Sequence, residues 1–316
     1  MNGIINVYKE KGYTSHDVVA KLRGILRQKK IGHTGTLDPQ AEGVLPVCLG
    51  NATRLCDLLT DKTKEYEAVL RLGVTTDTQD MTGEVLSEAP VTVSEDDITN
   101  IMSTFKGKIL QVPPMYSALK VNGRKLVDLA REGIEVERKA REIEIYELEI
   151  LEINLPLVRF RVNCSKGTYI RTLCQDIGEK AGCGGAMENL IRTRVDRFEI
   201  KDALTLEQIE QVRDDRRLDE ILYPVDDVFL HLPAVTVKNE FRKVIDNGNS
   251  LYPKMYEPRV EFYTDEKKTP AQLRVYNEDK IFYGIYVYDT ERRRFKPYKM
   301  FLDKEALKEK YGKEYF

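Results

Sequence analysis

The sequence predicts an α+β protein in which a mixed, mostly antiparallel sheet is flanked by helices and followed by a small β-rich domain. Strand-like and helix-like runs are interleaved, and several strand pairs are joined by short connections, which is typical of this fold class. The clearest strand is LVRFRVNC (157–164), where apolar residues alternate with arginine and asparagine. From about residue 231 the pattern changes to short strands separated by turns. We therefore expect one large domain over 1–230 and a second over 231–316.

The helices of the first domain are predicted from apolar residues at helical spacing behind a capping residue. Thr14-x-x-Asp17, Ser94-x-x-Asp97 and the Thr-x-x-Gln that begins at Thr205 have the capping-box pattern of a helix start. Helices are expected directly after Thr14 and over 51–59, 94–105, 124–132, 169–182 and 205–212.

The strands are predicted from alternation or from short apolar runs bounded by turn residues. They are expected at 3–9, 44–49, 64–73, 142–153 and 157–164 in the first domain, and at 234–237, 271–276 and 280–289 in the second, where the turn residues DNGNSLYP (246–253) stand between them. Residues 107–140 contain Pro113-Pro114 and Asn122-Gly123, so an irregular surface excursion from the sheet is predicted there.

Composition limits the function classes. The net charge of −2 over 316 residues argues against nucleic-acid binding through bulk charge, although lysine and arginine cluster at 21–30, 192–197 and 291–299. Five cysteines without a C-x-x-C pair and three dispersed histidines suit a reducing cytoplasm and give no metal site. The first residues have the pattern of neither a signal peptide nor a membrane anchor. We expect a cytoplasmic protein that binds neither metal nor membrane.

Asp38 is the first candidate functional residue, in the stretch KIGHTGTLDPQAEGVLPVCLG (30–50). Turn chemistry accounts for the glycines and for Asp38-Pro39, so Asp38 could simply form a turn. Its crowded loop directly before an apolar strand also suits a working carboxylate. A nucleophile elbow and a P-loop are absent from the sequence. A hydrolase that uses Asp38 and Glu42 as a carboxylate pair remains an alternative.

Arg171 is the second candidate, because a cation in the first turn of a helix opposes the helix dipole. It could be an arginine at a helix edge with its head in water. The sharper hypothesis is that a nearby anion, Asp38, holds it there, which would keep that carboxylate ionised and oriented. Tyr66 and Tyr169 could be ordinary strand and helix-start residues or aromatic faces for a base to stack on. Leu190 reads as core, and His33 alone reads as a loop histidine.

Taken together, six blocks in order make the chain resemble the TruB family of bacterial tRNA pseudouridine synthases over nearly all of residues 1–230. The blocks are GYTSHDVV (12–19), KIGHTGTLDPQAEGVLPVCLGNATR (30–54), KEYEAVLRLG (64–73), QVPPMYSALKVNGRKLVDLAREG (111–133), GTYIRTL (167–173) and MENLIRT (187–193). The resemblance implies the pseudouridine synthase fold, an insertion over 107–140 that clamps the T-arm of tRNA, and a C-terminal PUA-like RNA-binding domain.

The resemblance also implies residue roles. Asp38 would be the essential carboxylate, Arg171 its partner, and Tyr66 the ring that stacks on the target base and serves in removing the C5 proton. Other positions would contact or support the substrate: His33 in the space left by the flipped base, Tyr169 and Leu190 in the pocket, Lys9 behind the site, and the basic residues Lys120, Arg124 and Lys125 on the T-arm. Glu10 and Glu42 stand where the family usually has proline and a small residue.

The expected reaction is isomerisation of the T-loop uridine of tRNA, uridine-55, to pseudouridine by base flipping, without a cofactor. Attack on C1′, addition to C6 and formation of a glycal are all open as chemical paths. The family implies a monomer. A second alternative from another class is a tRNA-binding protein or chaperone without catalysis.

Overall fold

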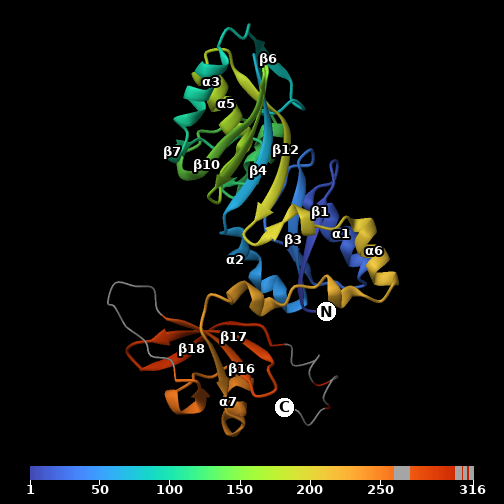
Figure 1. The fold of residues 1–316 in the computed structure, drawn as a ribbon, viewed down its shortest axis with the longest axis vertical. Coiled ribbons are helices and arrows are strands. Elements are labelled where there is room, and N and C mark those ends of the chain that lie inside the picture. Colours follow the sequence, from blue (N-terminus) through green and yellow to red (C-terminus); the bar gives the residue numbers. More distant parts are fainter. Residues whose placement is uncertain (260–270, 303–307, 309–311, 313–316) are drawn as a thin grey trace.

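The computed structural model describes residues 1–259 and 271–302, together with residues 308 and 312. The described residues form a nine-stranded sheet and, beyond a linking segment, a separate five-stranded sheet (Figure 1). The expected α+β fold with a mixed, mostly antiparallel sheet and a C-terminal β-rich domain is confirmed.

The large sheet has the strand order β1-β3-β12-β4-β11-β10-β7, with β2 added beside β3 and β13 beside β12. Strand β12 runs parallel to β3 and antiparallel to β4, so the parallel pairing lies in the middle of the sheet. The strands are β1 (Gly3–Lys9), β2 (Ile31–His33), β3 (Glu42–Leu49), β4 (Lys64–Leu72), β7 (Gly107–Gln111), β10 (Arg141–Asn154), β11 (Leu157–Cys164), β12 (Gly185–Val195) and β13 (Phe198–Glu199). A separate hairpin pairs β5 (Val74–Thr76) with β6 (Val85–Glu88).

Helices cover the large sheet in two groups, visible in Figure 1. Helices α1 (Ser15–Ile25) and α6 (Leu206–Asp214) share one hydrophobic cluster with β1 and β3. Helices α3 (Glu95–Ser103) and α5 (Ile170–Lys180) share another with β4, β10 and β11. The capping boxes of Thr14, Ser94 and Thr205 are all formed. The short elements are α2 (Cys56–Thr60), η1 (Gly50–Leu55), η2 (Ile200–Asp202), η3 (Leu218–Glu220) and η4 (Val225–Phe229).

Four strands of the sheet were not predicted: the short strands β2 and β13, and the longer strands β7 and β12. Strand β12 lies inside the sheet between β3 and β4, but register shifts at Met187/Asn189 and Arg192/Arg194 break the alternation that would reveal it. Strand β7 lies within the expected excursion and pairs with β10 at the edge of the sheet. The prediction that the excursion begins at residue 107 is therefore wrong, because 107–111 belongs to the sheet and the chain departs from it at residue 112.

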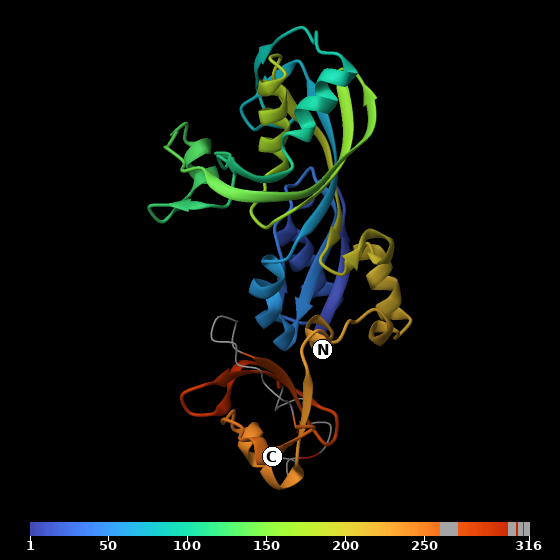
Figure 2. The same ribbon diagram turned by 60° about the vertical axis from the view of Figure 1, so that its left-hand side comes forward.

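The insertion segment (112–140) projects from the body of the domain, as its green ribbon shows in Figure 2. It holds a small hairpin of β8 (Lys120–Val121) and β9 (Arg124–Lys125), followed by α4 (Leu126–Arg131). Asn122 and Gly123 form its two-residue turn with φ angles of 50° and 83°. Positive φ at both positions matches the hairpin turns that favour Asn-Gly.

The C-terminal sheet has the order β15-β14-β16-β17-β18. Its elements are β14 (Ala234–Val237), η5 (Asn239–Phe241), α7 (Arg242–Asp246), η6 (Pro253–Met255), β15 (Tyr256–Glu257), β16 (Gln272–Asn277), β17 (Phe282–Asp289) and β18 (Arg294–Met300). The turn expected at 246–253 is present: the chain leaves α7 at Asp246, Gly248 has a φ of +65°, and Leu251 then forms a bridge to Phe295. Residues 260–270, 303–307, 309–311 and 313–316 of the expected second domain lie outside the described residues.

The two sheets meet near η1 and α2. The backbone carbonyl of Arg54 accepts a hydrogen bond of 2.7 Å from Lys299 Nζ, and Leu59 and Phe229 share a hydrophobic cluster with Ile285 and Phe301. A search of the described helices found none long and apolar enough to cross a membrane.

Gly43 provides a test of the β3–β12 pairing. Its φ is +105°, and an added Cβ would lie 2.3 Å from the carbonyl oxygen of Arg192. We expect Gly43→Ala to lower the free energy of unfolding by about 3 kcal/mol or more, because backbone strain and a backbone clash add together. Gly12, with φ +90° and no atom within 4 Å of an added Cβ, is the matched control that carries the strain alone. Urea unfolding of both variants checks this, and equal losses would contradict it.

Candidate active site

The Asp38 loop (residues 34–41) connects β2 to β3 and is held from several sides. Ser15 Oγ accepts a hydrogen bond of 2.9 Å from the Leu37 amide, and Lys9 Nζ donates to the Pro39 carbonyl at 3.2 Å. Within the loop the Ala41 amide donates to the Asp38 carbonyl at 3.1 Å. The Asp38 side chain itself is 41% exposed. The anchored loop thus presents a carboxylate to an open space.

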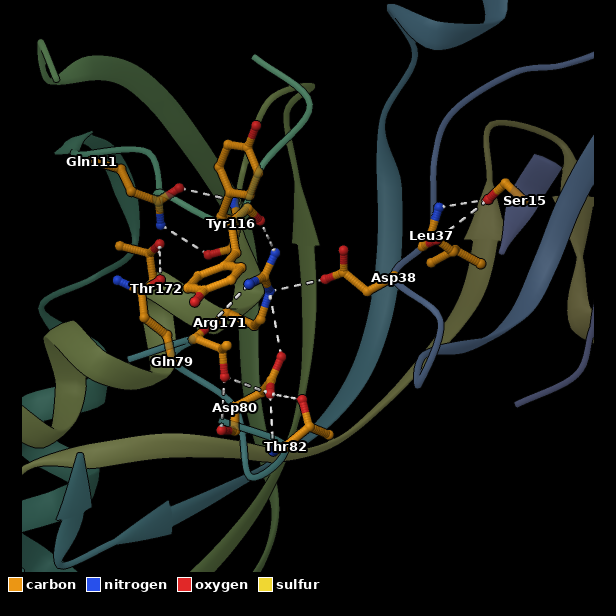
Figure 3. Close-up of polar contacts among 12 residues, drawn as sticks. Ser15, Leu37, Asp38, Gln79, Asp80, Thr82, Gln111, Tyr116, Arg171 and Thr172 are labelled. Carbon is orange, nitrogen blue, oxygen red and sulfur yellow. Dashed lines mark hydrogen bonds and ion pairs between the residues drawn. The ribbon is translucent and has the colours of Figure 1, made fainter. Parts of the chain in front are cut away.

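Arg171 faces this carboxylate from the first turn of α5 (Figure 3). Its Nε lies 2.9 Å from Asp38 Oδ2, so the ion pair expected from the sequence is present. The guanidinium also donates to the carbonyls of Thr78 at 2.9 Å and Tyr116 at 2.8 Å. With its side chain only 6% exposed, Arg171 has a fixed geometry that orients Asp38.

Asp80 is a second carboxylate at Arg171 that the sequence analysis missed. Its Oδ2 lies 3.9 Å from Arg171 Nε, the same nitrogen that pairs with Asp38, and Figure 3 shows it below the guanidinium, with Asp38 to the right. Its Oδ1 accepts hydrogen bonds from the hydroxyl of Thr78 at 2.8 Å and from the amide and hydroxyl of Thr82 at 3.0 and 2.6 Å. The Thr-x-Asp-x-Thr pattern was the available signal, since such side chains bond their local backbone.

Gln111 was also missed, and it fixes the start of α5. Its side-chain amide accepts from the Tyr169 amide at 2.8 Å and donates to the Tyr169 carbonyl at 3.0 Å. Tyr169, the residue before the helix, has no side-chain capping bond of its own. The end of β7 therefore sets the position of Tyr169 and, through it, that of Arg171.

Tyr66 and Leu190 lie on the adjacent strands β4 and β12 and are 8% and 6% exposed. They share a hydrophobic cluster with Leu37, the neighbour of Asp38. Burial raises the pKa of the Tyr66 hydroxyl, and the Asp38 charge adds to this, while the Arg192 guanidinium opposes it. Burial likewise raises the pKa of Tyr169. Both rings are thus neutral phenols near neutral pH.

His33 ends β2 at the edge of the Asp38 loop. Burial and the charge of Arg192 lower its pKa, so the ring is neutral at pH 7. Its Nδ1 accepts a hydrogen bond of 3.4 Å from the Gly35 amide. The proton of the neutral ring is therefore on Nε2, which leaves a donor for a ligand.

Lys9 is fully buried behind the Asp38 loop, where its Nζ also donates to the Glu10 carbonyl at 3.1 Å. Burial, helped by the charge of Arg192, lowers its pKa to about 8, against the attraction of Asp38, Glu42 and Asp17. From this position Lys9 can support the Asp38 loop, as the resemblance implied.

The low pKa of Lys9 predicts a pH-dependent stability. Between pH 8 and the ordinary value of 10.5, the unfolded chain holds a proton that the folded chain has released, so stability rises with pH there. One such proton is worth about 1.4 kcal/mol per pH unit. We expect Lys9→Met to remove this slope from urea-unfolding curves measured between pH 8 and 9.5. Lys64, whose pKa is also about 8, titrates in both proteins and cancels in the difference. If stability changes with pH equally in the wild type and in Lys9→Met, Lys9 does not have the lowered pKa.

Lys120 and Arg124 lie apart from these groups, exposed on the hairpin of the insertion segment. Arg124 is paired with Glu132, whereas Lys120 lies opposite Lys125 in the hairpin. Burial, together with the charge of the nearby Glu42, the other acid considered, raises the pKa of Tyr8 to about 12. The structure thus brings Asp38 to Arg171, and sets Glu42 against a tyrosine.

Comparison with known proteins places this geometry in a family. Residues 23–170 match the profile of the TruB family pseudouridylate synthase (N terminal domain), and residues 171–229 match that of the tRNA pseudouridylate synthase B C-terminal domain. The tRNA pseudouridine synthase B of Lachnoclostridium phytofermentans is 54% identical over 96% of this chain and 100% of its own length. That of Clostridium tetani is 46% identical over 90% of this chain and 95% of its own.

Solved structures of pseudouridine synthase complexes resemble this chain over most of its length. A chain from an H/ACA ribonucleoprotein bound to a substrate RNA containing 2′-deoxyuridine superposes with a TM-score of 0.70 at 27% identity, covering 96% of this chain and 86% of that one. A chain from a Cbf5–Nop10–Gar1 complex gives the same TM-score at 28% identity and the same coverage.

Proposed function

Because this chain belongs to the TruB family of pseudouridylate synthases, we propose that it isomerises the T-loop uridine of tRNA, uridine-55, to pseudouridine, with Asp38 as the essential carboxylate. The observation that carries the proposal is the 2.9 Å ion pair between Asp38 and Arg171 at the open edge of an anchored loop. The ion pair orients the carboxylate without burying it.

The reaction needs little more than such a group. The bond between N1 and C1′ breaks, a bond between C5 and C1′ forms, and the C5 proton is exchanged for one on N1. Attack on C1′, addition to C6 and formation of a glycal all begin from an ionised carboxylate close to the sugar or the ring. The role of Asp38 is therefore common to the three routes.

The buried rings account for substrate placement. Flipping a base out of its stack costs a few kcal/mol, which stacking in the pocket offsets. Tyr66 offers its ring for this stacking and its oxygen for the C5 proton, with Leu190 and Tyr169 as pocket walls. His33, with Nε2–H free, takes the place that the target base leaves in the T-loop.

The rest of the substrate would be held by shape and phosphate contacts, as is usual for RNA. The insertion segment clamps the T-arm, with Lys120 and Arg124 on its hairpin, and the C-terminal sheet serves as a PUA-like RNA-binding domain. We assign residues 1–230 to the catalytic domain and 231–316 to the PUA-like domain, and we expect a cytoplasmic monomer.

Tritium release tests this function. Wild-type protein is incubated with an unmodified tRNA transcript labelled at C5 of uracil, and with a matched transcript in which the T-loop uridine is replaced by cytidine. We expect release of one tritium per molecule from the first and none from the second. Equal release from both would reject the T-loop position. No release with retained tRNA binding would leave an RNA-binding protein without catalysis.

A further inference from the structure

Arg192 is a buried cation for which the proposed chemistry gives no role. It lies in β12 with 1% of its surface exposed. Its Nε donates to the Val44 carbonyl at 2.7 Å and its Nη2 donates to the Gly35 carbonyl at 3.2 Å. Among the described residues, no carboxylate oxygen lies within the 4.0 Å ion-pair distance of its guanidinium. A buried charge without a counter-ion is costly, so its retention calls for an explanation.

Tyr66 is the titratable neighbour of Arg192 that matters for the proposed reaction. The two residues are directly opposite each other in the β4–β12 ladder, so both side chains lie on the same face of the sheet. Burial raises the pKa of the Tyr66 hydroxyl, whereas the positive charge of the neighbouring Arg192 guanidinium lowers it. The other charged or titratable groups around this pair are Lys9 from β1, His33 from β2, Asp38 from its loop, Lys64 from β4 and Cys164 from β11.

We propose that Arg192 is a positioning residue that acts through Tyr66, its buried cross-strand neighbour, by stabilising the phenolate that takes the proton from C5. This inference rests on the role proposed above for Tyr66. Arg192 also donates to the Gly35 carbonyl, so the residue paired with Tyr66 across the two strands also holds the loop that carries Asp38.

The proton transfer balances in this arrangement. After C5 has joined C1′, C5 still carries its hydrogen. The C5–H bond breaks, its electron pair forms the C5=C6 double bond, and the N1=C6 pair moves to N1, which takes a proton from water. The C5 proton goes to the Tyr66 phenolate. A neutral phenol could not accept it, and burial together with Asp38 disfavours the phenolate, whereas Arg192 favours it.

The test is the pH dependence of single-turnover tritium release, because a purely structural role would not follow the acidity of residue 66. For wild type we expect the rate to rise with pH as the phenolate fraction rises. Arg192→Gln should lower the rate about tenfold for each unit by which the Tyr66 pKa rises. Arg192→Lys keeps the charge without the planar fork, so its rate should fall between the two.

Placing 3,5-difluorotyrosine, a more acidic phenol, at position 66 is the decisive step. We expect it to restore most of the rate lost in Arg192→Gln, and circular dichroism checks the fold of each variant. If Arg192→Gln does not fold, the same comparison is made on Arg192→Lys. A normal rate in the Arg192 variants, or a loss that difluorotyrosine leaves unchanged, overturns this inference. Absence of release by the wild type would instead reject the proposed function.

Discussion

Asp38→Asn is expected to reduce tritium release from C5-labelled tRNA by about 10⁴-fold, the upper end of what one acid–base group supplies. The amide is nearly isosteric but carries no charge, so it can neither attack, add to the ring nor remove a sugar proton. Binding of the tRNA should be almost unchanged, because the loop is anchored by Ser15, Lys9 and Arg192 and not by the Asp38 side chain. Filter binding and tritium release on the same preparation measure both quantities.

Glu42→Gln is the matched control. Glu42 lies four residues further along, where its charge acts on Tyr8, and it forms no ion pair with Arg171 among the described residues. Release should therefore remain near the wild-type rate. Comparable losses in the two variants would favour a carboxylate-pair hydrolase, and free uracil or cleaved RNA among the products would then identify it.

The parts of the fold set by neighbouring residues could be predicted from the sequence. The three capping boxes formed as expected because each joins a hydroxyl to a residue three positions away. The strand β11 was clear because each of its own residues is paired on both sides and one of its faces is buried; the two register shifts of the β10–β11 ladder lie in β10. The loop of Asp38 was recognised from its turn residues and from the resemblance.

The parts of the fold and of the site that depend on residues distant in the sequence could not be predicted. Strand β12 is a strand because β3 and β4 flank it, while its own bulges hide the alternation. Gln111, at the end of β7, hydrogen-bonds the backbone of Tyr169 at the start of α5. Asp80, in a loop, forms an ion pair with Arg171. Polar residues of this kind are common on surfaces, and only the fold shows that these two are enclosed. The sequence also gives no sign that Arg192 is buried without a carboxylate as its ion-pair partner.

Arg171→Met is expected to cost about 3–5 kcal/mol of stability, because it removes one partner of an enclosed ion pair. The loss should come mainly from Asp80, whose side chain is 14% exposed, and less from Asp38, which is 41% exposed and can be solvated. Tritium release should fall steeply as well, since Asp38 loses the group that orients it. Arg171→Lys should recover part of the stability, but a single ammonium cannot reach Asp38, Thr78 and Tyr116 together.

A double-mutant cycle with Asp80→Asn separates the two carboxylates. Asparagine keeps the side-chain oxygen that accepts from Thr78 and Thr82, and removes only the charge. In the wild-type background Asp80→Asn should destabilise the protein, because Arg171 loses an attraction. In the Arg171→Met background the same change should stabilise it by about 1–3 kcal/mol, since no enclosed charge is then left without a partner. Urea unfolding of the four proteins measures the coupling. Additive effects would mean that Asp80 and Arg171 do not interact across their 3.9 Å separation, and that Asp38 is the carboxylate to which Arg171 is coupled.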